Sequence, residues 1–248
     1  MNKILLVTGA GRGIGAAVAL QAAAQGWSLA VNYANNAQAA EEVVRRAKAL
    51  GVQALAMQAD VAQESQVLRM FQRIDTELGR LDALVNNAGV VDLPSRVDAM
   101  SFARLRRMFD INVLGSMVCA REAVLRMSTG HGGKGGAIVN LSSAAARIGS
   151  PGQYVDYAAA KGAIDVFTLG LAKEVALEGI RVNAVRPGII DTEIHASGGQ
   201  PNRAREVAPT VPMQRAGSAD EVAQAVLWLL SDASSYTTGA VIDVTGGR

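Results

Sequence analysis

The sequence is poor in the residues that build disulfides and metal sites, with one cysteine, Cys119, and two histidines, His131 and His195. A lone cysteine cannot form a disulfide within the chain, which is typical of the reducing cytosol, where we expect this protein to reside. The histidines stand far apart in the sequence, so we expect no metal site. No apolar run reaches the length of a membrane span, and the first run is too short for a signal peptide.

An excess of charge of one sign is also lacking. Lysine and arginine number 24 against 22 acidic residues, for a net charge of +2, and no basic run exceeds a few residues. We therefore expect no binding to nucleic acid or to anionic membranes. Arg104, Arg106 and Arg107 form a cluster, but they lie in a helical pattern and are predicted to be a solvated face. Half of the residues are apolar and 19% are charged, as in a globular protein with a full core.

Short apolar runs alternate with longer amphipathic stretches along the whole chain. The runs predicted as strands are residues 4–7, 29–31, 54–57, 83–85, 137–141, 180–185 and 240–244, and the helical stretches include 37–50, 67–78 and 102–127. This alternation predicts a parallel sheet covered on both faces. Because no linker or repeat interrupts it, residues 1–248 are predicted to form one doubly wound α/β Rossmann domain of about seven strands. Ser218 and Glu221 have capping-box spacing and should begin the last long helix.

Two glycine-rich stretches occur in different contexts. Residues 8–15, TGAGRGIG, join a strand to a helix. Glycines there permit a tight turn and a close approach to a pyrophosphate, which the helix N-terminus attracts, so we predict a phosphate-binding loop rather than a turn that binds nothing. Residues 130–136, GHGGKGG, follow a helix and enter a strand. They are predicted to be a flexible connector at the N-terminal end of that strand, opposite the ligand-binding edge.

A series of motifs resembles the classical branch of the short-chain dehydrogenase/reductase family, in order and in spacing, over essentially the whole chain. The motifs are residues 8–15, 60–61 (DV), 86–89 (NNAG), Asn112, 141–143 (LSS), 157–161 (YAAAK) and 186–192 (RPGIIDT). Within that family the chain is similar to glucose/ribitol dehydrogenase-like and 3-oxoacyl-[acyl-carrier-protein] reductase-like members. The resemblance implies a homotetrameric oxidoreductase that transfers hydride between nicotinamide and a carbonyl or secondary alcohol.

The stretch YVDYAAAK holds two tyrosines, of which only Tyr157 stands four residues before Lys161. On a helix these two side chains are neighbours, and a lysine ammonium at that distance would lower the pKa of the phenol by about 2 units. The resemblance makes Tyr157 the proton donor, assisted by Ser143, Lys161 and Asn112. Ser143 precedes Tyr157 by fourteen positions, one more than in many members, and Ser142 is the competing serine.

The resemblance also implies which residues hold the cofactor. Tyr157 and Lys161 face its nicotinamide end, and Asp60 has a helix cap as its alternative role. The other residues that the resemblance assigns to the cofactor are Gly9, Arg12, Gly13, Ile14 and Gly15 at the pyrophosphate; Asp60 and Val61 at the adenine; Asn87, Ala88 and Gly89 at the ribose and sheet end; and Pro187, Gly188, Ile190 and Thr192 beside the carboxamide.

The second predicted strand ends without the acidic residue that usually accepts hydrogen bonds from the ribose 2′-hydroxyl of NAD. Tyr33 occupies its place, and the next acid, Glu41, lies too far into the following helix. Arg12 offers a guanidinium to a 2′-phosphate, and Asn32 and Tyr33 can add neutral donors. NADP(H) is therefore predicted to be preferred over NAD(H), the alternative being that Arg12 is merely exposed and both cofactors are accepted.

The substrate itself is not fixed by the sequence. The walls of its pocket are expected from residues 90–96, 147–154 and 192–215, and the polar, glycine-containing segment 192–215 is expected to be a mobile lid over a small or polar molecule. Among the rivals, a non-catalytic nucleotide-sensing protein of this fold should lose the tyrosine-lysine pair. An enoyl reductase should space that pair more widely, and an extended-family epimerase should have a longer C-terminal region.

Overall fold

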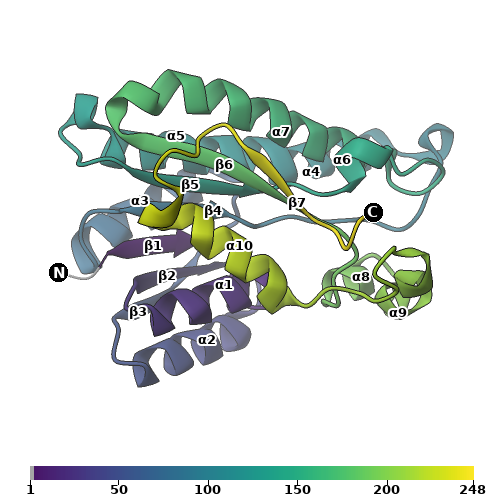
Figure 1. Cartoon of the computed structure of the whole chain (residues 1–248), viewed down its shortest axis with the longest axis horizontal. Coiled ribbons are helices and arrows are strands. Elements are labelled where there is room, and N and C mark those ends of the chain that lie inside the picture. Colours follow the sequence, from purple (N-terminus) through teal and green to yellow (C-terminus); the bar gives the residue numbers. More distant parts are fainter. Residues whose placement is uncertain (1–2) are drawn as a thin grey trace.

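The protein, described by a computed structural model over residues 3–248, is built around one seven-stranded parallel sheet. Residues 1 and 2 of the predicted domain lie outside the described part. The strand order is β3-β2-β1-β4-β5-β6-β7, as expected of a doubly wound fold (Figure 1). The strands are β1 (Ile4–Val7), β2 (Ser28–Tyr33), β3 (Ala54–Gln58), β4 (Ala83–Asn86), β5 (Gly136–Leu141), β6 (Ile180–Pro187) and β7 (Val241–Val244).

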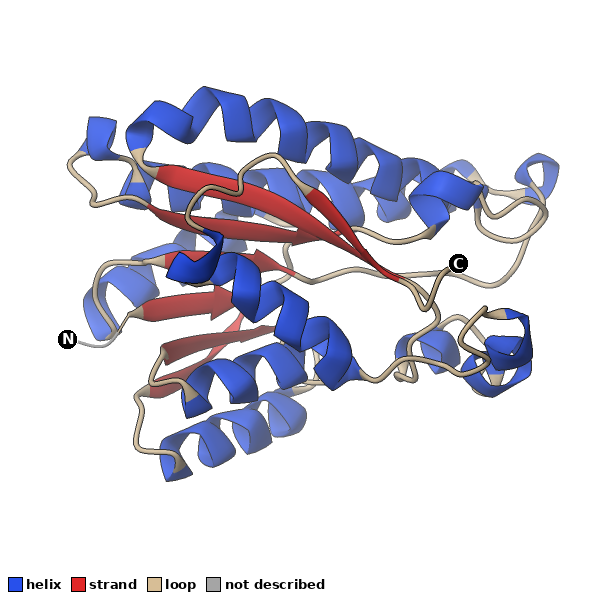
Figure 2. Ribbon diagram, viewed as in Figure 1, coloured by secondary structure: helices blue, strands red, loops and turns tan. Residues whose placement is uncertain are grey.

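Helices cover both faces of this sheet (Figure 2). One face carries α1 (Gly13–Ala24), α2 (Ala37–Ala49) and α10 (Ala219–Leu230); the other carries α3 (Glu64–Glu77), α5 (Gly115–Met127) and α7 (Val155–Val175). The remaining helices are α4 (Phe102–Phe109), α6 (Ala145–Ile148), α8 (Ile194–Ser197) and α9 (Arg203–Val207). The last two lie beyond the carboxyl ends of the strands (Figure 1).

The sheet reverses its order between β1 and β4, and this reversal positions the site. The chain leaves β1 for β2 and β3 and then crosses back to β4, so the segments that follow β1 and β4 diverge. In open parallel sheets, ligands bind in the crevice that such a reversal leaves at the carboxyl ends. The continuous apolar runs of the central strands follow from the same arrangement, because both faces of each strand are covered.

Several predicted boundaries move where tertiary contacts extend or interrupt an element. β4 continues to Asn86, whose side chain donates to Asn140 Oδ1 of β5 at 3.0 Å, and β6 continues to Pro187. The helix predicted over residues 102–127 is interrupted by a π-helical turn, Asp110–Leu114. The capping box is confirmed, since Ser218 Oγ accepts from Glu221 N and Glu221 Oε2 accepts from Ser218 N.

The prediction that the three clustered arginines form a solvated face is wrong for Arg104. Its guanidinium makes two hydrogen bonds to Asp156, at 2.8 and 3.2 Å, and a third to the carbonyl oxygen of Leu93 at 2.6 Å. The Asp156 side chain is fully buried and that of Arg104 is only 10% exposed. Helical periodicity alone could not find this ion pair, because the partner lies on α7, directly before Tyr157.

The glycine-rich connector, residues 130–136, begins within a short turn at Thr129–His131 and ends at Gly136, the first residue of β5, as the sequence predicts. It is therefore at the edge of the sheet opposite the crevice. Over residues 3–248, no helix is both long enough and apolar enough to cross a membrane.

Candidate active site

Two adjoining cavities open at the carboxyl ends of the strands. One, of about 490 Å³, is lined by both Tyr154 and Tyr157 and is called the tyrosine cavity. The other, of about 530 Å³, is lined by the loop between β1 and α1 and is called the glycine-loop cavity. Both are bounded by Ile14, Asn87 and Thr192, so they are neighbouring parts of one crevice.

Nearly all of the residues selected from the sequence line one of these cavities. Gly15 and Asn112 line neither. The glycine-loop cavity is lined by Gly9, Arg12, Gly13, Ile14, Asn32, Tyr33, Asp60, Val61, Asn87, Ala88, Gly89 and Thr192, and the tyrosine cavity by Ser143, Tyr157, Lys161, Pro187, Gly188 and Ile190.

Helix α7 carries Tyr157 and Lys161 one turn apart, and the lysine Nζ lies 5.6 Å from the centre of the tyrosine ring. The sequence argument expected the lysine to lower the pKa of the phenol. In the protein, burial raises the pKa of Tyr157 to about 12, and a hydrogen bond with Ser143 only partly opposes that rise. Burial dominates because a phenolate loses its hydration in the cavity, whereas the lysine ammonium is engaged elsewhere.

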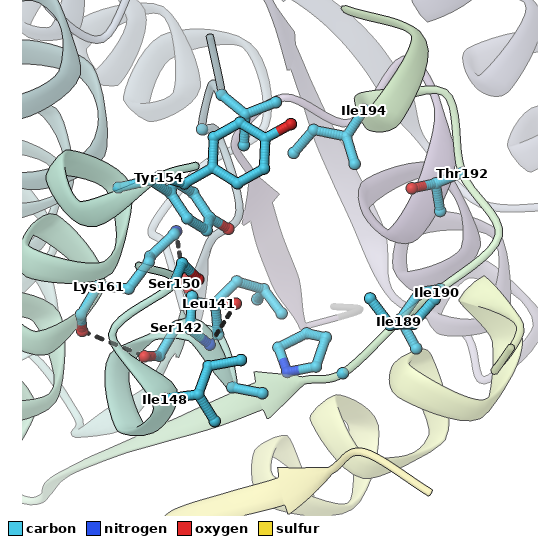
Figure 3. Close-up of a pocket in the computed structure, with 18 of the residues that line it drawn as sticks. Leu141, Ser142, Ile148, Ser150, Tyr154, Lys161, Ile189, Ile190, Thr192 and Ile194 are labelled. Carbon is cyan, nitrogen blue, oxygen red and sulfur yellow. Dashed lines mark hydrogen bonds between the residues drawn. The ribbon is translucent and has the colours of Figure 1, made fainter. Parts of the chain in front are cut away.

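Lys161 Nζ donates a 2.7 Å hydrogen bond to the carbonyl oxygen of Leu141, at the end of β5 (Figure 3). Burial lowers the pKa of Lys161 to about 8, and the negative charge of Asp165, one turn further along α7, opposes that fall. The ammonium therefore remains largely protonated at neutral pH although its side chain is enclosed.

The structure separates the two candidate serines. Ser142 is buried, and its hydroxyl donates to the backbone carbonyl of Lys161 at 3.2 Å, which ties the end of β5 to α7 (Figure 3). Ser143 is hydrogen-bonded to Tyr157 and lines the same cavity. Ser143 is thus the serine that lies beside the phenol. Its role in catalysis stays a prediction.

Asn112 lies behind the crevice, in the π-helical turn, with its side chain fully buried. Its Oδ1 accepts from Val90 N at 3.2 Å, and its Nδ2 donates to the carbonyl oxygens of Val90 and Met108 at 3.1 and 3.0 Å. It fixes the chain after β4. The role in positioning a water, implied by the resemblance, stays a prediction.

The loop after β1 is shaped to leave room for a ligand. A Cβ on Gly15 would lie 2.5 Å from Asn87 Nδ2 and 2.6 Å from the carbonyl oxygen of Gly9, so only glycine fits there. Asn87 Nδ2 itself donates to the carbonyl oxygens of Thr8 and Gly9. Helix α1 begins at Gly13 with no side-chain cap, so its first amide groups remain available to an anion such as a pyrophosphate.

Asn32 does not offer the free donor that the sequence argument assigned to it. Its side chain is buried, with Oδ1 accepting from Gly9 N and Nδ2 donating to the carbonyl oxygens of Met57 and Ala59. The amide therefore holds the glycine loop against β3. Asp60 lines the cavity and accepts from Ala62 N at 3.0 Å within a turn. It does not cap α3, whose N-cap is Gln63, so the alternative role of a helix cap is wrong.

Sequence reasoning missed several lining residues that other elements contribute. Arg107, assigned to a solvated face, lines the glycine-loop cavity and lies 3.5 Å from Asp92. Asn36 lines it as well and caps α2 through its Oδ1. The only available signal for Asn36 was its position just before a helix, and Arg107 gave none.

The segment 192–215 contacts both cavities. Arg12 Nη2 donates to Ser197 Oγ at 3.0 Å, which joins the glycine loop to α8. Tyr154 donates to Gln200 Oε1 at 2.7 Å, just before α9. Thr192, Ile194 and Arg203 of this segment line the tyrosine cavity, and its role at a substrate pocket stays a prediction.

No group of three or more histidine, cysteine and acidic side chains that could hold a metal ion occurs among the described residues. The side chain of His195 lies outside the described part. Cys119 is buried, which raises the pKa of its thiol to about 12.

A sequence profile for a family described as enoyl-(acyl carrier protein) reductase matches residues 9–248. The chain is 54% identical over 245 residues to the uncharacterized oxidoreductase YgfF of Escherichia coli K12, covering 99% of each protein. It is 38% identical over 247 residues to the 3-oxoacyl-[acyl-carrier-protein] reductase FabG of Staphylococcus aureus, covering 100% of this chain and 98% of that protein. A short-chain type dehydrogenase/reductase from Mycobacterium marinum superposes with a TM-score of 0.92 at 35% identity, covering 99% of this chain and 94% of that one.

The buried lysine generates a prediction about stability and pH. Lys161 has a pKa of about 8 in the folded protein against 10.5 when unfolded, so within that window the unfolded chain binds the proton and the folded chain does not. The free energy of unfolding should therefore gain from this group as pH rises through the window. In Lys161→Met that gain should be absent, and the stability of wild type relative to the variant should rise by roughly 2–3 kcal/mol. Urea unfolding at a series of pH values measures the difference, and parallel pH curves for the two proteins would contradict it.

Proposed function

Because this chain belongs to the short-chain dehydrogenase/reductase family, we propose that it is an NADP(H)-dependent oxidoreductase that interconverts a carbonyl compound and its alcohol. The observation that carries the proposal is that Tyr157, Ser143 and Lys161 meet at one cavity, which adjoins the cavity of the glycine loop. The uncapped α1 terminus and the glycine-only approach at Gly15 fit a dinucleotide at that loop. A bound nicotinamide would supply the hydride.

The chain's own residues would orient the carbonyl and move the proton. Ser143 would hold the carbonyl oxygen beside Tyr157, whose hydroxyl would donate a proton to that oxygen while hydride reaches the carbon. The product is the alcohol, and the reverse sequence oxidises it. By resemblance, Lys161 would also bind the nicotinamide ribose hydroxyls.

The electrostatics of the pair explain how a phenol of raised pKa could do this work. An ammonium about 5.6 Å from the ring, at an effective dielectric constant near 20, stabilises a phenolate by about 3 kcal/mol, or about 2 pKa units. In the structure burial prevails and the pKa of Tyr157 is about 12, so the proposed proton transfer depends on Lys161 being charged, which its pKa of about 8 allows at neutral pH. The positive charge of an oxidised nicotinamide would lower the tyrosine pKa further.

Carbonyl reduction is favoured over the rival activities by the same residues. Tyr157 and Lys161 stand four positions apart, closer than expected of an enoyl reductase. A protein of this fold that only senses nucleotide would have no use for Ser143 hydrogen-bonded to Tyr157.

Segment 192–215 is proposed to be a lid, because it contacts both cavities. The cytosolic location stays a prediction.

Preference for NADP(H) is part of the proposal and rests on the charges at the ribose end of the glycine-loop cavity. Tyr33 stands where an acid would repel a 2′-phosphate, and Arg12 of the glycine loop lines the same cavity without a carboxylate partner among the described residues. Arg107 also lines the cavity, but it is paired with Asp92. Charge-assisted contacts from a guanidinium to phosphate are among the stronger hydrogen bonds. Asn32, whose side chain is engaged internally, plays no part in this argument.

Tyr157→Phe should remove the proton donor and leave cofactor binding nearly intact. Turnover of any accepted substrate should fall by about 10²–10⁴-fold, the usual contribution of general acid catalysis. Steady-state kinetics with NADPH measure the loss, and a cofactor titration checks that binding persists. Tyr154→Phe is the matched control, since Tyr154 lines the same cavity but bonds Gln200, and it should be mild. Near-normal turnover in Tyr157→Phe would refute the assignment.

Arg12→Ala should weaken binding of NADPH by about 10–100-fold, the value of a charged hydrogen bond, and that of NADH far less. Tyr33→Asp should shift preference toward NADH by charge repulsion. Fluorescence titration of both cofactors measures the ratio, with Arg69→Ala, an exposed arginine on α3, as the control. Wild-type protein that binds NADH as tightly as NADPH would contradict the proposed preference for NADP(H).

A homotetramer is also proposed. The resemblance assigns the stretches 155–175, 225–230 and 240–244 to two subunit interfaces. The first two expose Val166 (70%), Leu169 (43%) and Trp228 (42%). Burying such apolar surface in contacts between copies would be favourable. Light scattering of the purified protein at micromolar concentration should give a tetramer mass. Val166→Lys should reduce that mass, and a monomeric wild-type protein would rule the assembly out.

A further inference from the structure

The charged side chains that line the tyrosine cavity are all cationic. Lys161, Arg203 and Arg248 contribute to the lining, and no aspartate or glutamate does so among the described residues. Lys161 is accounted for by its place beside Tyr157. The two arginines have no part in proton transfer, so their charge calls for another explanation.

Arg203 stands at the start of α9, within segment 192–215. Its Nη1 donates to Gln200 Oε1 and its Nη2 to Gln153 Oε1, both at 2.8 Å. Its guanidinium carbon lies 5.3 Å from the centre of the Tyr154 ring. These neighbours fix the position of the guanidinium without neutralising it.

Arg248 supplies the second cation. It lines the tyrosine cavity, and its Nη1 is buried without a hydrogen-bond partner. A buried donor of this kind costs free energy unless a ligand or water satisfies it.

Other arginines with little exposure show what a purely structural role looks like in this protein. The Arg104 side chain, 10% exposed, is paired with Asp156, and the Arg186 side chain, 20% exposed, is paired with Asp165. Neither Arg203 nor Arg248 forms an ion pair with an aspartate or glutamate side chain among the described residues. Hydrogen bonds to the amide oxygens of Gln200 and Gln153 require N–H donors but not a positive charge.

Resting on the oxidoreductase function proposed above, we propose that the substrate is a short oxo acid or hydroxy acid whose carboxylate binds Arg203, with Arg248 as a second cation. A guanidinium presents paired donors that match the two oxygens of a carboxylate. The cavity wall also includes Val91, Ile148 and Ile189, which suit a short aliphatic chain between the carboxylate and the reacting carbon. The carboxylate would orient the carbonyl toward Tyr157 and Ser143.

The test compares short straight-chain oxo acids with their own methyl esters, using the full-length protein and NADPH. The two members of each pair share the carbonyl and differ in the charge. Wild type should reduce the preferred acid with a kcat/KM at least about tenfold above its ester, and Arg203→Gln should lower that ratio by about tenfold or more, as expected for losing a charged hydrogen bond. A general disturbance of α9 would lower kcat/KM for the acid and for its ester alike, so it would leave the ratio of the two unchanged.

Matched variants assign the effect to position and charge. Arg205→Gln removes an exposed arginine of the same helix that lines neither cavity and should leave the ratio unchanged. Arg203→Lys should retain part of the preference, and Arg248→Gln should lower it. Thermal unfolding checks that each variant folds.

A binding measurement separates this inference from the proposed function. Calorimetric titration with a saturated carboxylic acid of the same chain length, in the presence of NADP, should show binding to wild type that Arg203→Gln weakens by about tenfold or more. Reduction of esters, sugars or neutral thioesters without preference for acids would overturn the inference and leave the oxidoreductase function standing. Carboxylate binding that depends on Arg203, with no carbonyl compound reduced, would overturn the function and support the anion site. Failure of both would overturn both.

Discussion

Lys161 carries a positive charge into a part of the protein from which water is largely excluded, and the contacts around it keep that charge in place. A buried cation is costly unless it is paired or hydrogen-bonded. Here the Leu141 carbonyl accepts from the ammonium, Ser142 holds the backbone of the same residue, and Asp165 opposes the loss of the proton. Asp165 is itself paired with Arg186 of β6. Two strands and one helix are thereby fixed around a single charge.

The features that could be predicted from the sequence are those that depend on local patterns. The pairing of Tyr157 with Lys161 depends on helical spacing alone, and the glycine loop depends on a strand, a turn and a helix in succession. Both are local, and the parallel sheet follows from the alternation of apolar runs and amphipathic stretches. The choice of Ser143 over Ser142 as the catalytic serine stays a prediction. The structure adds what spacing could not give, namely that the Ser142 hydroxyl donates to the Lys161 carbonyl oxygen whereas Ser143 is hydrogen-bonded to the phenol.

What the sequence could not predict depends on contacts between distant segments. Asn32 looked like a free donor at the end of a strand, yet its side-chain amide is hydrogen-bonded to the backbone of Gly9, Met57 and Ala59. Arg104 and Arg107 looked alike as helix charges, but one meets a buried aspartate and the other a cavity. The direction of the Tyr157 pKa shift was wrong for the same reason, because a spacing argument contains the lysine charge but not the cost of burial.

The segment 192–215 gives the two cavities a common wall, since Thr192 and Ile194 line both. At its beginning, Ser197 accepts from Arg12, the residue expected to meet a 2′-phosphate. Further along, Gln200 and Arg203 contact Tyr154 and Gln153 at the rim of the tyrosine cavity. A phosphate that drew the Arg12 guanidinium away from Ser197 would free one attachment of the segment, and an anion bound at Arg203 would strengthen another. Linkage requires such effects to be reciprocal. On the proposed function, Arg12 in one cavity and Arg203 in the other would then favour anionic groups on cofactor and substrate alike.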